Sequence, residues 1–596
     1  MNKYLLINKI IIFFSSFFIA TASLYSTSDN EIFKAMQDEI DRTMNELSLE
    51  SLKKPYYVEY TLRMSQEYNV KSVLGAITES GFNKINTLSV KIRIGSYKFD
   101  NSNYLDFGLS FFGSGDDEEG FQNRRIPEEF DYSSLRRELW LATDAAYKQS
   151  QEILTKKETA LKNRISKDST YDFLEVKPEI NIDTEKIPVL NLKLYEKLCN
   201  SLSEIFVRYH KIQSSLVSFE FLPVKTYYLN SEGMKYIKTE FFTGIEVVAS
   251  TQTQDGMIIS DFFSAYNRFP EELPSNDSLL KGTENVAKNI IESLNSPELD
   301  EPYSGPVLFI SQSSAEIFAQ TFAPNLVAQR SPLTETGLQE NERYSLFQNK
   351  IGARVLPEFL SINDIPEKKY YKNTPLVGHF KIDDEGIVAN ELQLVRDGYL
   401  KTLLSSRTPT KRVRKSNGNS RGGSPMFSIL EMSVTEDYPK KEDFQKDEKG
   451  LIEKMIKLCQ DRELPFGILV KKVMDQNIMF TTLYSITSSE FNIPQFQSIP
   501  IIEAYKVFQD GKMELIRGCE LKNLAAQSFK DIVAVGKIKY ALNILAPAVV
   551  SPFISGGKQY VASSVIVPAL LFEDCEIRPI EGNFPKLPII SNPNSN

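Results

Sequence analysis

Residues 377–422 read VGHFKIDDEGIVANELQLVRDGYLKTLLSSRTPTKRVRKSNGNSRG and indicate how the second half of the chain is built. In this stretch Asp397-Gly398 separates two apolar runs. This dipeptide is typical of a tight β-hairpin, because both central turn residues need positive φ. Asp510-Gly511 repeats the pattern further along the chain. We therefore expect the C-terminal half to be β-rich and built from meanders.

The same stretch contains a glycine-rich basic loop, from Arg407 to Ser424. It holds so many small and charged residues that we expect it to be solvated and mobile and to border a binding face. The following run MFSILEMSV (426–434) is a candidate edge for the addition of a peptide strand. The candidate peptide-binding residues of the loop are Arg407, Arg412, Arg414, Asn419 and Arg421.

The N-terminal half mixes helices and strands. Residues 28–50 place apolar side chains at helical spacing, and a longer amphipathic helix starts near Ser133. Between and after these helices, runs such as PYYVEYTLRM and SLVSFEFLPVKTYYL are rich in β-branched and aromatic residues, which is the strand signal. Residues 295–306 read as a linker. The sequence thus predicts an α+β protein, with an N-terminal α/β domain of hairpin sheet and long helices (23–300) and a β-rich domain (301–596).

The first 22 residues are typical of a secretory signal peptide. Two lysines precede a short apolar run that ends at Ala20-Thr21-Ala22, an A-x-A cleavage pattern. No later run is long and apolar enough to cross a bilayer. We therefore expect an exported protein, periplasmic or extracellular, with no membrane span after cleavage.

Composition disfavours nucleic-acid binding and a histidine-rich metal site. The net charge is −9, whereas a nucleic-acid binder needs a basic surface. The chain has only two histidines, His210 and His379, which lie far apart and for which structural roles are expected. Its four cysteines form no CxxC pair, and buried free thiols are expected for most of them, although export would permit disulfides in any of three pairings.

Several segments together resemble the TldD/PmbA family of modulators of DNA gyrase and zinc metallopeptidases. In the N-terminal half they include PYYVEYTLRM and LRRELWLATDAAYKQSQEILTKKETAL. In the C-terminal half they include SGPVLFISQSSAEIFAQTFAP, the stretch 377–422, and the tail from AYKVFQDGKMELIRG to SSVIVPALLFEDCEI. The resemblance covers most of the chain between about residues 30 and 580. It implies a two-domain molecule that pairs as a homodimer, or as a heterodimer with a TldD-like subunit, around a shared cavity.

The resemblance also implies where the active members of the family bind zinc. They carry HExxxH on the helix that follows the strand GPVLFIS, with a cysteine ligand later. Here the two histidine positions fall on Ala319 and Pro324 and the glutamate position on Gln320, with Glu316 nearby. Neither alanine nor proline binds a metal, and glutamine is no general base. We therefore expect no bound zinc and no other cofactor, although zinc is the family's metal.

Two hypotheses follow. In the first, the chain is a non-catalytic TldD/PmbA-like protein that binds extended peptide or pairs with a catalytic metallopeptidase subunit. In the second, it is an exported hydrolase with a rearranged active site, for which Glu316, Asp383, Asp384 and Glu385 are the acidic candidates. Gly386, which follows Asp383–Glu385, indicates a tight turn flanked by charged residues.

Overall fold

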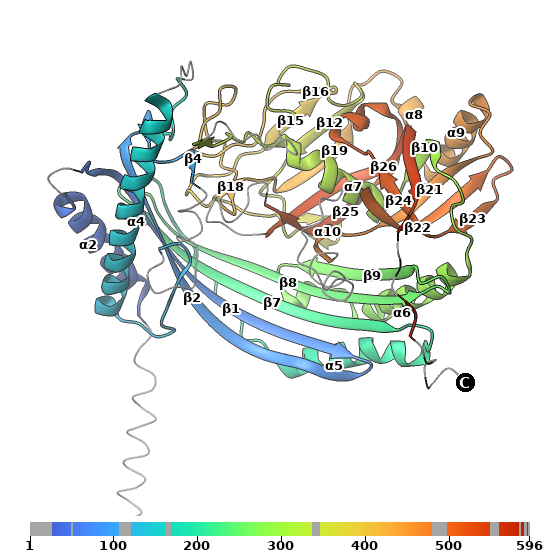
Figure 1. Ribbon diagram of the computed structural model, residues 1–596, viewed down its shortest axis with the longest axis horizontal. Coiled ribbons are helices and arrows are strands. Elements are labelled where there is room, and N and C mark those ends of the chain that lie inside the picture. The colour runs from blue at the N-terminus through green and yellow to red at the C-terminus, as the bar shows by residue number, and fades with distance from the viewer. Residues whose placement is uncertain are drawn as a thin grey trace, which may run out of the picture.

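The computed structural model describes residues 27–48, 52–106, 121–162, 169–335, 346–478, 498–548 and 560–582, with a few single residues between 584 and 593. Within these ranges the chain forms two large sheets, one of eight strands and one of twelve. The long strands of the first sheet curve beneath the domain that contains the second (Figure 1). The α+β fold class, with a hairpin sheet and long helices followed by a β-rich half, is confirmed.

The first sheet is an antiparallel set of long strands. Its strands include β1 (Pro55–Val73), β2 (Ala76–Ser96), β7 (Ser214–Asn230), β8 (Lys235–Gln252) and β9 (Ile258–Asn267), with neighbours in the order β2-β1-β7-β8-β9. Three short strands complete it: β3 (Phe99–Asp100), β5 (Arg124–Ile126) and β6 (Ile180–Ile182). Side chains alternate between the two faces of a strand, so each long strand offers one row to each side of the sheet.

Four helices cover one face of this sheet. α2 (Asp29–Glu46) and α4 (Tyr132–Lys162) pack at one end, and α5 (Leu192–Glu204) and α6 (Asn276–Asn295) at the other (Figure 1). Ser28 and Glu31 form a capping box that begins α2. Alternate residues of β7, including Val217, Phe219 and Phe221, are buried in the core with α5 and α6. The expected opening helix and long second helix are both confirmed.

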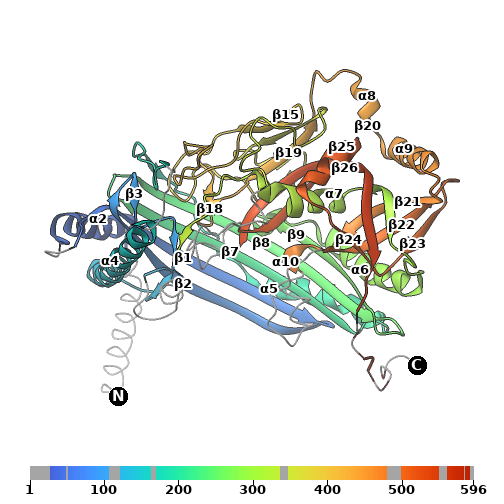
Figure 2. The same cartoon turned by 45° about the horizontal axis from the view of Figure 1, so that its top comes forward.

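The second sheet starts at β10 (Tyr303–Phe309) and contains a closed ring. β10, β21 (Phe466–Val473), β22 (Ser498–Phe508), β24 (Cys519–Lys522) and β26 (Tyr560–Pro579) pair in that order, and β26 pairs back to β10. The remaining larger strands are β12 (Leu360–Asp364), β15 (Leu392–Arg396), β19 (Ile429–Val434) and β25 (Ile532–Pro547). α9 (Glu448–Asp461) packs beside the ring, and Figure 2 shows it next to β21 and β22.

Both predicted Asp-Gly hairpins form. Asp397-Gly398 joins β15 to β16 (Tyr399–Leu400), with φ of 51° and 76° at the two turn residues. Asp510-Gly511 lies between β22 and β23 (Met513–Ile516), which also pair antiparallel. Parallel pairs, β10 with β21 and β19 with β26, join these hairpins into the larger sheet.

The prediction that 426–434 forms an open edge is wrong. β19 lies inside the second sheet, paired antiparallel with β12 on one side and parallel with β26 on the other. Its backbone is therefore paired on both sides at Leu430 and Glu431, so β19 is not an edge strand there. The parallel partner comes from more than 120 residues later in the chain, which local pattern cannot foresee.

None of the described helices is long and apolar enough to cross a membrane. The first 22 residues, for which a signal peptide is predicted, lie outside the described residues.

Candidate functional site

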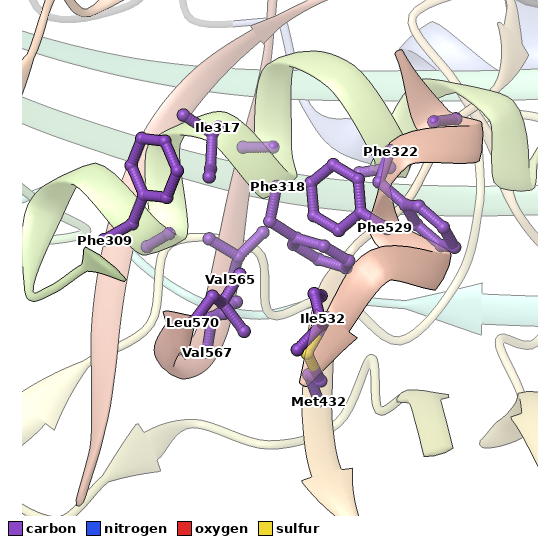
Figure 3. Packing of buried hydrophobic residues seen from close by; sticks show 14 of the residues in the cluster. Phe309, Ile317, Phe318, Phe322, Met432, Phe529, Ile532, Val565, Val567 and Leu570 are labelled. Atoms are coloured by element: carbon purple, nitrogen blue, oxygen red, sulfur yellow. The ribbon is translucent and has the colours of Figure 1, made fainter. Parts of the chain in front are cut away.

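The helix that follows β10 holds the positions where a metal motif was expected. α7 (Gln312–Ile317) continues through η3 (Phe318–Phe322) and η4 (Ala323–Leu326). Figure 3 shows Ile317, Phe318 and Phe322 among the apolar side chains of β25, β26 and the segment near Phe529. Ala319 and Ala323 are buried in the same cluster, and Pro324 is buried beside them. The two positions expected for histidines are thus part of, or next to, a packed apolar core.

One polar stripe runs along this helix. Gln312, Glu316 and Gln320 are spaced four residues apart and therefore share a face. The Gln320 amide donates to Glu316 Oε1 at 2.6 Å and to the Met474 carbonyl at 2.9 Å. The Gln312 amide exchanges two hydrogen bonds with the backbone of Val473. This stripe binds the end of β21.

The donor set at this helix does not fit zinc. A zinc site needs three or four nitrogen, sulfur or oxygen ligands that converge. The helix offers one carboxylate, Glu316, which already accepts from Gln320 and Gln312. Within the described ranges, no three His, Cys, Asp or Glu side chains are grouped so that they could hold a metal ion. The described residues around this helix therefore do not supply the ligand set of a zinc site.

A large cavity lies between the two domains. Its volume is about 1070 Å3. β7 and β8 supply the floor, with the row of side chains that faces away from the helices, including Ser218, Glu220, Lys238, Glu240 and Glu246. The C-terminal domain supplies the opposite wall, with residues of 377–382, Arg421, Asn477, Leu545 and 560–562. The cavity is large enough for several residues of an extended peptide.

The floor carries carboxylates that lack cationic partners. Glu67 on β1, Glu220 on β7 and Glu246 on β8 line the cavity, and no described cation forms an ion pair with any of them. Burial, and the neighbouring Glu67, raise the pKa of Glu220. The nearby Lys71 lowers it in part, but the Lys71 ammonium is paired with Glu79 at 2.8 Å. The floor is therefore electrostatically suited to a cationic group.

Glu246 is the most perturbed of these acids. Burial raises its pKa to about 7, while a hydrogen bond from the Tyr266 hydroxyl at 2.5 Å opposes the shift. Asp475 and Glu220 raise the pKa further by repulsion. The Asn477 amide donates to Glu246 at 3.3 Å and lies 3.4 Å from the Tyr266 hydroxyl. Glu246 thus changes charge near neutral pH inside the cavity.

Two cations that line the cavity, Arg421 on the opposite wall and Lys238 on the floor, are bonded within the protein. The Arg421 guanidinium donates to the carbonyls of Phe427 and Ala562 and lies over the Phe380 ring. Lys238 is paired with Asp384 at 2.7 Å. Arg421 and Lys238 are therefore already bonded, while Lys381 also lines the opposite wall and the carboxylates Glu67, Glu220 and Glu246 line the floor.

The two histidines are far from forming one site. His210 is exposed just after η1 (Ile205–Arg208), on the helix-covered side of the first sheet. His379 lines the cavity, and its Nδ1 lies 3.1 Å from the Pro366 carbonyl. Burial, with Arg268 nearby, lowers the pKa of His379 to about 4, so it is neutral at physiological pH.

The acidic cluster Asp383–Glu385 is occupied by structural bonds. Asp383 accepts from three backbone N–H groups, those of Glu385, Ile387 and Ser420. Asp384 accepts from the Gly422 N–H at 2.7 Å, and Glu385 from the Arg407 N–H at 2.8 Å. The tight turn at Gly386, with φ of 81°, is confirmed. The hydrogen bonds of this turn connect the beginning of the stretch 377–422 to its end. Because the three carboxylates already accept these bonds, they are not available as a hydrolytic site.

The expectation of a solvated loop at 407–424 is wrong at its two ends, which are largely buried, whereas residues 411–417 are exposed or half-buried. Arg407 and Asn419 are completely buried, and Arg421 is 7% exposed. For Arg407 the reason is long-range: its N–H donates to Glu385, and its guanidinium donates to Glu232 and the Leu174 carbonyl in the N-terminal domain. Arg421 instead bonds to carbonyls of its own domain. Arg412 and Arg414 are exposed as expected, but they do not line the cavity. Of the five candidate peptide-binding residues, only Arg421 faces the cavity.

Sequence reasoning missed the floor of the cavity. The signal was present in β7 and β8, where Glu220 and Glu246 interrupt apolar strands at positions of one alternating row. A charge inside an apolar strand indicates a face that is not packed against helices. Asn477 could not have been found in this way, because it lies in the short helix α10 (Gln476–Ile478) beyond β21.

The C-terminal domain matches a known family. Residues 303–578 match the model of the PmbA/TldA metallopeptidase C-terminal domain. A curated protein from Archaeoglobus fulgidus, named a metalloprotease, is 32% identical over 91 residues, which is 15% of this chain and 20% of that protein. The chain therefore matches only about a fifth of the length of that relative.

Solved structures share the fold over nearly the whole chain. TldE from Thermococcus kodakarensis is 12% identical with a TM-score of 0.54, covering 91% of this chain and 100% of its own. Two candidate modulators of DNA gyrase are also similar. The one from Thermotoga maritima is 14% identical (TM-score 0.53, 91% of this chain), and the one from Bacteroides thetaiotaomicron is 12% identical (TM-score 0.56, 93%), each covered completely. At these identities the likeness establishes the fold alone.

Proposed function

Because the chain belongs to the TldD/PmbA family, whose C-terminal domain model covers residues 303–578, we propose that it is a non-catalytic member that binds extended polypeptide between its two domains. The observation that carries this proposal is the helix after β10. Ala319 and Pro324 stand where two metal ligands would be needed, and the amide of Gln320 is bonded to Glu316 and Met474. The helix keeps its place in the fold but has no ligands for the metal.

The cavity supports a binding role and suggests the class of peptide. Its volume suits an extended chain, and the floor carboxylates Glu67, Glu220 and Glu246 favour lysine or arginine side chains over acidic ones. We expect the peptide to be unfolded, because a folded protein would not enter an enclosure between two domains of one chain. The N-terminal Lys-flanked apolar run supports action outside the cytoplasm.

Pairing with another subunit is part of the same proposal. A member without metal ligands can still complete the cavity of a catalytic relative. A TldD-like subunit would be such a relative. The test is co-purification of the native protein, followed by measurement of its mass in solution. A protein that is monomeric and purifies alone would contradict this part of the proposal and leave peptide binding to be judged separately.

The main experiment measures binding and cleavage together. The full-length protein, dialysed extensively, is tested for metal by elemental analysis and incubated with a fluorescent unfolded peptide rich in lysine, with and without chelator. We expect saturable binding, no cleavage, and zinc well below one atom per chain. The matched control peptide has glutamate in place of every lysine and should bind more weakly. Stoichiometric zinc with chelator-sensitive cleavage would overturn the proposal.

A second candidate function rests on Glu246. A carboxylate with a pKa of about 7 in a cavity is suited to general acid or base chemistry, so a hydrolase with a rearranged site remains the alternative. Cleavage that chelator does not affect, and that Glu246→Gln abolishes, would favour it. Cleavage that survives this substitution would exclude Glu246 as the catalytic group.

A further inference from the structure

The segment Lys472–Ile478, at the end of β21, touches both domains. On the C-terminal side it is bound by the polar stripe of α7 and η3. The Val473 N–H donates to Gln312 Oε1 at 3.0 Å, and the Gln312 amide donates back to the Val473 carbonyl at 3.1 Å. The Gln320 amide donates to the next carbonyl, that of Met474, at 2.9 Å. Two successive residues of the segment are thus held by one helix.

On the other side, the same segment is bound to the N-terminal sheet. The Lys472 ammonium lies 2.7 Å from Asp261 and 2.5 Å from the Phe262 carbonyl, both on β9. Ile478 is buried with Val248 and Phe262. Between these contacts, the Asp475 carboxylate accepts from the N–H of Asn477 at 2.7 Å, which fixes a short turn. That turn places the Asn477 amide 3.3 Å from Glu246 in the cavity.

The chemistry of position 320 explains why glutamine suits it. Its amide has two N–H donors, and both are used, one on Glu316 and one on the Met474 carbonyl. A glutamate at this position would have no donor and would place its oxygens against a carboxylate and a carbonyl. The residue that would be the general base in an active relative is therefore replaced by one that can bind the segment.

We propose that Gln320 is a positioning residue: the helix that carries the catalytic motif in active relatives serves here to anchor Lys472–Ile478, and so holds Asn477 against Glu246 in the binding cavity. The part of this inference that concerns ligand affinity rests on the proposed function. The anchor itself does not, because it is a property of the protein without ligand.

Hydrogen exchange of the full-length protein tests the anchor without any ligand. Gln320→Ala removes the bond to Met474, and we expect exchange of the amides at 473–478 to accelerate about fivefold, the equivalent of one ordinary hydrogen bond. Gln320→Glu should accelerate it more, because the new carboxylate repels Glu316. Thr321→Ala, on the next residue, is the control and should leave exchange in this segment unchanged. If Gln320→Ala fails to fold, Gln312→Ala releases Val473 instead and should have the same local effect.

Peptide binding tests the route through Asn477. With the fluorescent lysine-rich peptide as probe, Gln320→Ala and Asn477→Ala should each weaken binding several-fold. The double variant should bind no more weakly than Asn477→Ala alone, because Gln320 acts through Asn477. Fully additive losses would overturn that route.

The outcomes separate the two proposals. Unchanged exchange at 473–478 in both the Gln320 and the Gln312 variants overturns the anchor, whatever the peptide does. Accelerated exchange in a protein whose unmodified form binds no peptide supports the anchor and contradicts the proposed function.

Discussion

The guanidinium of Arg407 lies 2.7 Å from the carboxylate of Glu232, and this largely buried ion pair joins the C-terminal domain to the first sheet. The same guanidinium donates to the Leu174 carbonyl and stacks 3.9 Å from the centre of the Phe173 ring. The Arg93 guanidinium also lies over that ring, 3.7 Å from its centre. Two residues separated by 175 positions thus fix how the domains meet.

Arg407→Ala is therefore expected to lower stability strongly. Removing one partner of a buried pair leaves the other charge uncompensated, which costs about 3–5 kcal/mol. The measurement is the free energy of unfolding from a denaturant titration of the full-length protein. The matched control is Arg412→Ala in the same loop, which is exposed and should change stability by no more than about 0.5 kcal/mol. Equal, small effects of the two substitutions would show that the Arg407 pair does not hold the domains together.

Binding of a lysine-rich peptide should increase with pH between about 6 and 8. Burial raises the pKa of Glu246 to about 7, so this carboxyl is mostly neutral at the lower pH and charged at the higher one. Only the charged form attracts a cation. Glu246→Gln keeps an acceptor for the Tyr266 hydroxyl but cannot ionise, so it should bind weakly with little dependence on pH. The measurement is the affinity for the peptide, by fluorescence anisotropy across this pH range. The same pH profile in the unmodified protein and in Glu246→Gln would contradict the role of Glu246.

The four cysteines should react with a thiol reagent only after unfolding. Cys199, Cys459, Cys519 and Cys575 are all buried and free, as expected from their spacing. Burial raises the pKa of Cys199 and of Cys519 to about 12, which removes nearly all thiolate at neutral pH. Titration with an aromatic disulfide should count close to zero thiols in the native protein and four in denaturant. Rapid reaction of a native thiol, or fewer than four after unfolding without reductant, would contradict the buried, unpaired state.

The native protein should begin near Ser23. The apolar run that ends at Ala20-Thr21-Ala22 has the flanks and length of a cleaved signal rather than of a spanning helix. N-terminal sequencing of protein from the exported fraction is the measurement. An intact Met1 on protein from the cytosol would contradict both cleavage and export.

The sequence by itself determined the elements and the residues that stand where the resemblance places the metal motif. The periodicity of 28–50, the alternation in the long strands and the two Asp-Gly turns depend on contacts between near neighbours, so they could be read directly. The residues at 319 and 324 are equally local information, because neither alanine nor proline has a side chain that binds a metal.

Only the tertiary structure decided which charged side chains are buried and which groups they contact. Nothing near Arg407 in sequence indicates Glu232 or Phe173 as its partners, and nothing near Glu246 indicates Asn477. The energy of a charged side chain depends on the groups packed around it, and here those groups come from the other domain. For that reason the two ends of a loop that reads as solvated are buried, β19 is an inner strand, and the acids of the first sheet line a cavity whose other wall is the second domain.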